Sequence, residues 1–318
     1  MLVTLAGCAV GGGLLWLNGW ANQAGPLGRH TYVQVPSGAG LKQIAGLLVE
    51  NGVIDKDWPL ILWAKLQDTG RNLKAGEYEF RPGMSPEGAL NLMRKGEVVI
   101  HQVSVPEGFT VAEVIARLDE NDRLSGGVWI TPPEGSLLPE TYNFERGTSR
   151  AAMLDRMKVA MDNTVADLWE GRAEDLPVKT MDEAIILASI VEKETSLRAE
   201  QPKVAGVFIN RLRKGMRLQS DPTVIFALTE GKAPLGRALT RADWKVDHPY
   251  NTYQNKGLPP GPIANPGRNA IAAVLNPQIH NYIFFVADGS GGHAFSVTYD
   301  EHKRNIERAR AARRAARN

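Results

Sequence analysis

The sequence ILASIVEKETS, Ile186 to Ser196, decides the main structural element of the chain and raises its main functional question. A run of apolar and small residues ends there in two glutamates, Glu192 and Glu194, which lie two positions apart. A T-x-x-E capping-box spacing that begins at Thr180 predicts a helix from Met181 to about Thr195. Both faces of this helix are apolar above the glutamates, so we expect it to be largely buried.

The two glutamates face opposite sides of the predicted helix. Positions two apart are separated by about 200°, so Glu192 and Glu194 cannot share one substrate bond. Glu194 continues the stripe of Leu187, Ile190 and Val191. Aliphatic neighbours desolvate a carboxyl group, and desolvation raises its pKa toward the range of a general acid at neutral pH. This reasoning favours Glu194 as an acid and gives Glu192 a supporting or solvated role. A helix end that merely faces solvent is the alternative.

Composition indicates an ordinary globular protein, with 318 residues, 43% hydrophobic and 23% charged. The net charge of +2 gives no reason to expect a nucleic-acid partner, which normally requires a basic domain or stripe. The basic stretch at residues 304–318 is expected to be a solvated tail, with weak contact to an anionic lipid or polymer as the alternative. One cysteine and six scattered histidines predict neither an internal disulfide nor a metal site, and we expect no cofactor.

The N-terminal segment is apolar. Residues 2–20 contain no charged side chain and match the roughly 20 residues that span a hydrocarbon core. Trp16 and Trp20 stand near its far end, as aromatic residues do at a membrane interface. We therefore predict a transmembrane anchor at residues 1–24. A cleaved signal peptide and a lipoprotein modified at Cys8 are the alternatives, and all three export the rest of the chain.

The remaining pattern predicts an α+β fold. A strand at 31–36, helices at 41–50 and 56–67, and a strand at 75–80 follow one another. The motif V-x-V-P-x-G begins at Val33 and recurs at Val103, each time before an amphipathic helix. Two strand–turn–helix units with the same turn requirement explain this recurrence, and a duplicated binding module is the alternative. Farther along, loops rich in glycine, proline and aromatic residues separate the helices, and we expect function to lie on these loops.

Five sequence blocks resemble the YceG-like endolytic murein transglycosylases, the MltG family: LLPETYNF, ASIVEKETS, VFINRLRKGMRLQSDPTVIF, YNTYQNKGLPPGPIANPG and YIFFVADGSGGHAFS. The resemblance extends from residue 31 to about residue 305. It implies a LysM-like βααβ subdomain at 30–97 and a mixed α+β catalytic domain at 98–318. It also implies that the catalytic residue is the second glutamate of the E-x-E pair, Glu194, at the C-terminal end of a helix.

The resemblance implies a lyase that cleaves the bond between N-acetylmuramic acid and N-acetylglucosamine within nascent glycan strands and so terminates their elongation. Glu194 would protonate the glycosidic oxygen and then accept the proton of the muramic acid's own 6-hydroxyl group, which leaves a 1,6-anhydro end. The implied location is the cytoplasmic (inner) membrane, crossed once, with the catalytic domain extracytoplasmic or periplasmic. The implied partners are glycan strands and the penicillin-binding proteins that synthesise them.

Tyrosine and amide side chains suit sugars, which offer apolar ring faces and many hydroxyl groups. The expected substrate-binding residues are Asn210, Arg211, Gln219, Asp221, Tyr250, Asn251, Tyr253, Glu140 and Tyr142. Loop packing, caps and buried ion pairs are the alternative roles for such residues. One rival function is a muramidase that hydrolyses with water, with Asp221 or Glu140 as the second carboxylate. The other rival is a membrane-anchored peptidoglycan-binding scaffold without catalysis.

Overall fold

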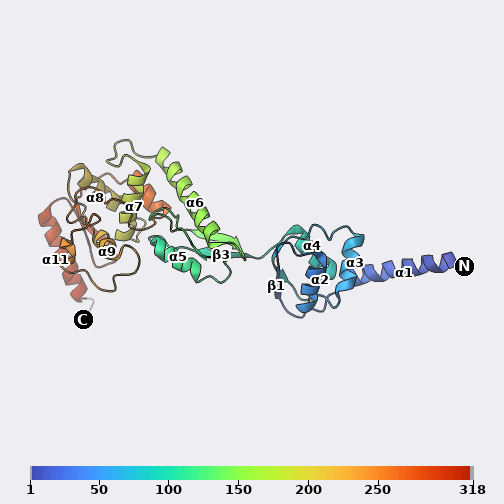
Figure 1. Cartoon of the computed structure of the whole chain (residues 1–318). Helices are drawn as coiled ribbons and strands as arrows, with labels where there is room; N and C mark the ends of the chain where they lie inside the picture. The colour runs from blue at the N-terminus through green and yellow to red at the C-terminus, as the bar shows by residue number, and fades with distance from the viewer. Residues whose placement is uncertain (1, 316–318) are drawn as a thin grey trace. The chain divides into compact units, whose positions relative to one another are not determined.

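The computed structural model describes residues 2–315, with side chains described for residues 10–312 and 314. The chain divides into two compact units. Figure 1 shows the chain coloured by residue number from blue to red. Unit 1 consists of residues 1–102 and 143–148, and unit 2 consists of residues 103–142 and 149–318. Strands β3 (Ile100–Ser104) and β4 (Thr141–Glu145) pair with each other and carry the chain between the units.

Unit 1 contains a strand–helix–helix–strand sequence, as predicted. Its elements are α1 (Leu2–Asn22), β1 (Thr31–Val35), α2 (Leu41–Glu50), α3 (Asp57–Leu66), β2 (Gly76–Phe80) and α4 (Pro86–Lys95). β1 and β2 are antiparallel, with Thr31 opposite Phe80. The helices cover this two-stranded sheet, and Tyr78 and Phe80 are fully buried between them. The description of this subdomain as LysM-like stays a prediction.

The predicted N-terminal transmembrane helix is wrong. α1 forms, but none of the helices in residues 2–315 has the length and apolar character needed to cross a membrane. The final turns of α1 are instead part of the protein core, because Leu17 and Trp20 are buried in unit 1. Trp16, expected at a membrane interface, stacks on Trp58 of α3 with ring centroids 5.6 Å apart. The side chain of Cys8 and the last three residues of the basic stretch lie outside the described part.

Unit 2 is mainly helical. Its helices are α5 (Val111–Asp119), α6 (Arg150–Glu170), α7 (Met181–Glu194), α8 (Gln201–Arg213), α9 (Asp221–Thr229), α10 (Arg268–Leu275) and α11 (Tyr299–Ala315). β5 (Phe284–Ala287) and β6 (His293–Ser296) form an antiparallel pair against which α11 packs. The α+β composition agrees with the sequence prediction.

α7 is the central helix of unit 2. It contacts α6, α8, α9 and α10, and its residues Leu187, Ala188, Ile190 and Val191 are completely buried. This confirms the expectation of a helix that is buried on several sides. Thr180 caps the helix by accepting a hydrogen bond from the Glu183 N–H at 3.1 Å. The helix therefore has a fixed start, a desolvated body and an end at Glu194 that reaches the surface of the core.

The recurring V-x-V-P-x-G motif forms the same local structure in both places. β1 leads through a turn to α2, and β3 leads through a turn to α5. Gly38 and Gly108 occupy corresponding turn positions with φ of 78° and 79°, a left-handed conformation that favours glycine. A shared turn requirement therefore accounts for the repeat.

Candidate active site

Glu194 ends α7 and lies half-buried at the edge of the core. Its Oε1 atom accepts a hydrogen bond from the Ser220 hydroxyl at 2.5 Å. The surrounding protein desolvates the carboxyl group and raises its pKa to about 7, against the opposing effect of the Ser220 hydrogen bond. The negative charge of Asp221 raises the pKa further, whereas Arg211 lowers it. Glu194 can therefore hold a proton near neutral pH and can also release it, as an acid–base catalyst must.

Ser220 is held in place by buried hydroxyl groups. It occupies the N-cap position of α9, yet its side chain does not cap that helix and points to Glu194 instead. Its N–H donates to Thr252 Oγ1 at 3.0 Å. Thr223 Oγ1 lies 2.8 Å from the same Thr252 oxygen and donates to the Ser220 carbonyl at 2.7 Å. Since all three side chains are buried, the hydroxyl that contacts Glu194 has a fixed position.

Asp221 anchors two aromatic rings beside Glu194. Its Oδ1 accepts hydrogen bonds from the Tyr253 hydroxyl at 2.7 Å and from Trp244 Nε1 at 3.0 Å. The two rings stack with centroids 5.6 Å apart and an interplanar angle of 23°. Burial and the Asp221 hydrogen bond raise the pKa of Tyr253, which stays a neutral donor. The pair forms a rigid aromatic surface of the kind on which a sugar ring can pack.

Arg211 supports the backbone of the site from the adjacent helix, α8. Its guanidinium is buried and donates to the carbonyls of Ile283 at 2.7 Å and Leu218 at 2.6 Å. Burial lowers its pKa, although the proximity of Tyr253 and Glu194 opposes this shift. Arg211 therefore brings a positive charge close to Glu194 while fixing the segment that leads to Ser220.

Glu192 points to a different part of unit 2. Its Oε2 accepts the N–H of Gly267 at 3.0 Å, at the residue that precedes α10. Burial raises the pKa of Glu192, and the Gly267 N–H opposes that rise. An added Cβ at Gly267 would collide with the Glu107 side chain, which would have to move. Glu192 thus ties the end of the GLPPGPIANPG loop to α7.

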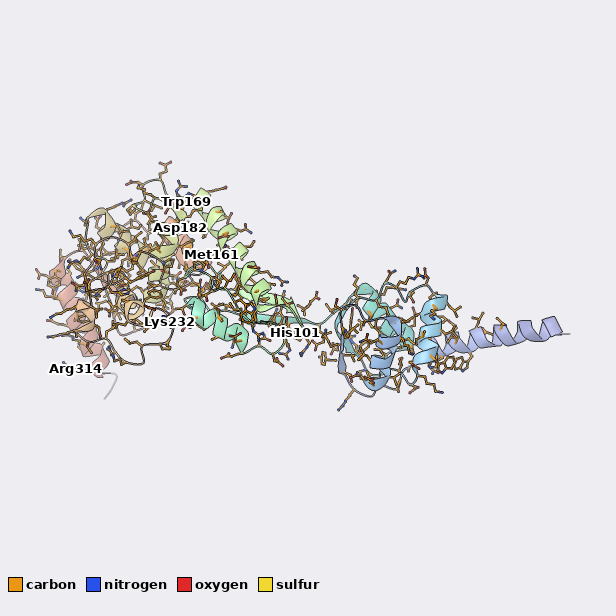
Figure 2. All side chains as sticks on the ribbon, in the orientation of Figure 1. His101, Met161, Trp169, Asp182, Lys232 and Arg314 are labelled. Atoms are coloured by element: carbon orange, nitrogen blue, oxygen red, sulfur yellow. The ribbon has the colours of Figure 1, made fainter. Side chains whose placement is uncertain are left out.

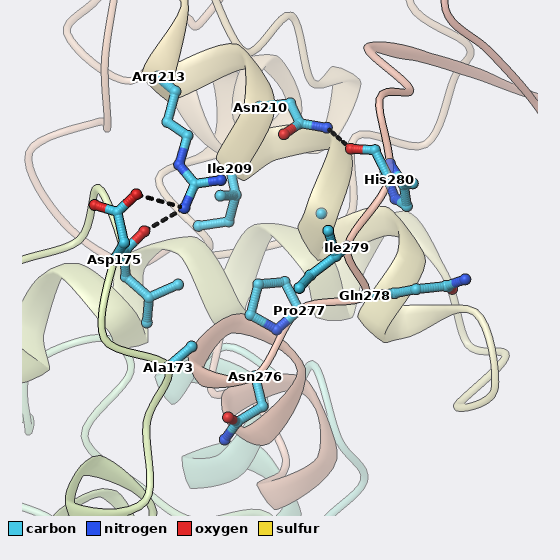
Figure 3. Close-up of a pocket in the computed structure, with 12 residues that line it drawn as sticks. Ala173, Asp175, Ile209, Asn210, Arg213, Asn276, Pro277, Gln278, Ile279 and His280 are labelled. Carbon is cyan, nitrogen blue, oxygen red and sulfur yellow. Dashed lines mark hydrogen bonds and ion pairs between the residues drawn. The ribbon is translucent and has the colours of Figure 1, made fainter.

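Two predicted asparagines have their amide groups engaged by the backbone. Asn210 donates to the carbonyls of His280 at 2.7 Å and Tyr282 at 3.0 Å. It lines a separate pocket of about 380 Å³, which also contains Asp175, Arg213 and His280 (Figure 3). Asn251 is fully buried; it donates to the carbonyls of residues 244 and 246 and accepts the N–H of Tyr253. It shapes the loop that carries Trp244 and Tyr253.

The other predicted residues vary in their surroundings. Gln219 is exposed next to Ser220 and has a positive φ of 52°. The Tyr250 ring packs on Phe226 at 4.7 Å. Glu140 is exposed, and Tyr142 donates its hydroxyl proton to the Leu138 carbonyl at 2.7 Å. The structure thus brings Arg211, Gln219, Asp221 and Tyr253 close to Glu194 and its Ser220 partner, and their substrate contacts stay predictions.

The sequence analysis missed two residues at the site, Ser220 and Trp244, and a further carboxyl group elsewhere in unit 2, that of Glu134. Ser220 has the sequence context of an ordinary cap, and Trp244 is an isolated tryptophan. Glu134 is a second carboxyl group in unit 2 whose pKa burial raises to about 7, although the Val111 N–H opposes the rise. It accepts that N–H at 3.0 Å and the Asn265 amide at 3.3 Å, so its position fixes the start of α5. The raised pKa of Glu134 comes from burial by segments that are distant in the sequence, so the residues around Glu134 do not predict it.

Comparison with known proteins places the chain among similar proteins. A family model described as the YceG-like family matches residues 33–308. An endolytic murein transglycosylase of Bacillus subtilis (strain 168) is 29% identical over 87% of the chain and 84% of its own length. The protein of that name from Streptococcus pneumoniae serotype 2 is 28% identical over 87% of the chain, which spans only 58% of that relative. A crystal structure of a yceG-like protein from Listeria monocytogenes is similar with a TM-score of 0.54 and 30% identity, covering 87% of this chain and 99% of that one.

Proposed function

The chain belongs to the YceG-like family, and on that premise we propose that Glu194 is the single acid and base of a murein lytic transglycosylase. The reaction class follows from the curated relatives, which are named endolytic murein transglycosylases. The chain is accordingly a lyase that cleaves peptidoglycan glycan strands. The observation that supports Glu194 most directly is a half-buried carboxyl group with a pKa raised to about 7 and a fixed hydroxyl partner.

The first step breaks the bond between N-acetylmuramic acid and N-acetylglucosamine. Protonated Glu194 donates its proton to the glycosidic oxygen, and positive charge develops at the anomeric carbon of the muramic acid. Ser220 stabilises the carboxylate that this step leaves behind. The stacked rings of Trp244 and Tyr253 support the sugar during the reaction.

The second step closes the 1,6-anhydro ring. The Glu194 carboxylate removes the proton of the 6-hydroxyl group on the same sugar, and the oxygen attacks the anomeric carbon. This attack is intramolecular, so its effective concentration is high and no carboxylate is needed to activate water. Glu194 regains its proton, and the atoms balance without net consumption of water.

The hydrolytic rival requires a second carboxylate at the reacting centre. Asp221 is nearby, but it accepts hydrogen bonds from Tyr253 and Trp244, which favours an anchoring role. Glu140 is exposed on another segment. Mass spectrometry of products from uncrosslinked glycan strands distinguishes the two reactions, because an anhydro end is lighter by one water than a reducing end. Predominantly reducing ends would support the muramidase.

A scaffold without catalysis is tested with Glu194→Gln, and Glu192→Gln is the matched control. We expect Glu194→Gln to abolish cleavage of glycan strands while the protein stays folded. Glu192→Gln should keep a measurable activity, because Glu192 binds the backbone of Gly267 and does not face Ser220. Unchanged cleavage by a folded Glu194→Gln protein would leave the scaffold as the better description.

The chain acts on the cell wall and therefore outside the cytoplasm, where murein is found. Cutting inside nascent strands would terminate their elongation. Penicillin-binding proteins are the proposed partners, since they make these strands, and the outer face of the cytoplasmic membrane is the proposed place of encounter. Co-purification with such synthases after crosslinking in cells tests this proposal, and crosslinks that exclude them would contradict it.

A further inference from the structure

A second pocket of about 370 Å³ lies in unit 2 next to the candidate active site, within the size range of ligand pockets. Its walls come from α9, the end of α7 and the loop at residues 231–237. The apolar part of its lining includes Pro222, Ile225, Phe226, Leu235 and Ile263. Lys193 also lines the pocket, and it directly precedes Glu194 in the chain, as Pro222 directly follows Asp221. The pocket therefore shares the end of α7 and the start of α9 with the site, although Glu194, Ser220 and Asp221 do not line it.

Lys193 supplies an accessible positive charge at this pocket. Its Nζ donates to the Gly108 carbonyl at 3.1 Å, and an ammonium group has three donors. Within the described residues no carboxylate lies within ion-pair distance of Lys193, although its charge lowers the pKa values of Glu134 and Glu192. The side chain is exposed, so its remaining donors are available to a ligand.

The other charged groups of the pocket are already engaged. Arg237 forms a two-pronged ion pair with Asp243, at 2.7 and 2.9 Å. Glu113 accepts the N–H of Thr110 at 2.8 Å in the capping box of α5. Asp243 therefore neutralises Arg237, and Lys193 is the cation of this lining that is left to contact an anion.

The loop at residues 231–237, on which Lys232 lies (Figure 2), is fixed at both ends. The Thr110 hydroxyl donates to the Gly231 carbonyl at 2.7 Å, and the Arg237–Asp243 pair holds the other end. Gly231 has a φ of 69°, and an added Cβ would lie 2.9 Å from the Phe226 ring. The pocket wall is therefore a constrained segment in close contact with α9.

The lining is mainly apolar with one available cation, and its two threonine hydroxyls donate to backbone carbonyls. It therefore offers few partners to the many hydroxyl groups of a sugar. It matches a short chain with small apolar side chains and a free carboxylate. In murein, the lactyl group of each muramic acid carries such a peptide, and the muramic acid is the sugar whose bond Glu194 would protonate. We propose that this pocket receives the peptide stem of the reacting muramic acid and that Lys193 binds a carboxylate of that peptide. The inference rests on the proposed function and adds a recognition element to the same site.

The binding test uses the full chain with Glu194→Gln, which prevents turnover. The probes are N-acetylmuramyl-L-alanyl-D-glutamate and the same glycopeptide with both glutamate carboxylates amidated, titrated by calorimetry. We expect the diacid to bind about fivefold more tightly than the diamide, the effect of one partly solvated ion pair. Adding Lys193→Met should bring the two Kd values together, whereas the control Lys214→Met, an exposed lysine at the end of α8, should keep them apart. Equal Kd values with Lys193 present, or a difference that survives Lys193→Met, would overturn the inference.

A cleavage assay separates this inference from the proposed function. Uncrosslinked strands with peptide stems are compared with strands stripped of peptides by an amidase. We expect Lys193→Met to reduce the ratio of kcat/KM for the two substrates about fivefold, mainly through KM. A wild-type protein that cuts neither substrate refutes the proposed function. If the wild-type protein cuts both substrates equally and Lys193→Met leaves the ratio of their kcat/KM values unchanged, only the role of the pocket is refuted.

Discussion

Replacing Ser220 with alanine should raise the pKa of Glu194 and extend activity to higher pH. The Ser220 hydroxyl donates to Glu194 Oε1 at 2.5 Å and favours the charged carboxylate, so its removal favours the protonated acid. A hydrogen bond to a charged group is worth about 1.5–3 kcal/mol, and one pKa unit corresponds to about 1.4 kcal/mol. Glu194 is half-buried, so water recovers part of this energy. We therefore expect a rise of about one unit from the native pKa of about 7.

The assay is the pH dependence of kcat on uncrosslinked glycan strands, with anhydro ends quantified by mass spectrometry. Glu194 must be protonated to act as the acid, so the wild-type rate should fall as pH rises through about 7. In Ser220→Ala the fall should move up by about one pH unit. The rate at low pH should decrease about tenfold, because the carboxyl group loses its fixed orientation. If the fall in rate at high pH stays at the wild-type pH or moves to lower pH, the assigned role of Ser220 is refuted.

Three further predictions follow from the same contacts. Asp221→Asn should lower the pKa of Glu194, because a negative charge that raises it is removed, and the alkaline limb should move to lower pH in the same rate assay. Glu194→Gln should stabilise the protein more at pH 8 than at pH 5, because the pKa of Glu194 is raised in the folded protein and its contribution to stability is lost as pH rises through about 7. After allowance for partial exposure, we expect a difference of about 2 kcal/mol in the free energy of unfolding, measured with urea at the two pH values. Trp244→Ala should raise KM about fivefold to tenfold with a smaller effect on kcat, since a stacking surface is lost; steady-state kinetics would contradict this if kcat alone changed.

Helical periodicity was sufficient to distinguish the two glutamates. The 3.6-residue period places Glu192 and Glu194 on different sides of α7, and their hydrogen-bond partners are Gly267 and Ser220 respectively. The apolar run before them also predicted the burial of α7. These features depend on neighbours within two helical turns, and such neighbours can be read from the sequence.

The hydrogen-bond partners of the asparagine amides, and contacts between residues far apart in the sequence, could not be predicted from local periodicity. Asn210 and Asn251 have the residue type of sugar ligands, but both bond to backbone carbonyls, and composition does not distinguish a sugar hydroxyl from a carbonyl. The Asp221 carboxylate meets the Tyr253 hydroxyl across 32 residues, which requires knowledge of how two loops fold. Trp20 shows the same limit, because an uncharged apolar segment has the same local sequence whether it contacts lipid or a protein core.

The segment from Leu218 to Thr223 breaks several local rules at one place. Gln219 has a positive φ of 52° although it is not glycine, and such a conformation costs about 1 kcal/mol or more. Ser220 stands at an N-cap but does not cap, which forgoes about 1 kcal/mol of helix stability. Arg211 offsets these costs by binding the Leu218 carbonyl, and Thr252 binds the Ser220 N–H. Local rules are broken together where a sequence is selected for something other than stability. Since the displaced Ser220 hydroxyl points to the carboxyl group of Glu194, the proposed role of Glu194 as acid and base would account for the strain in this segment.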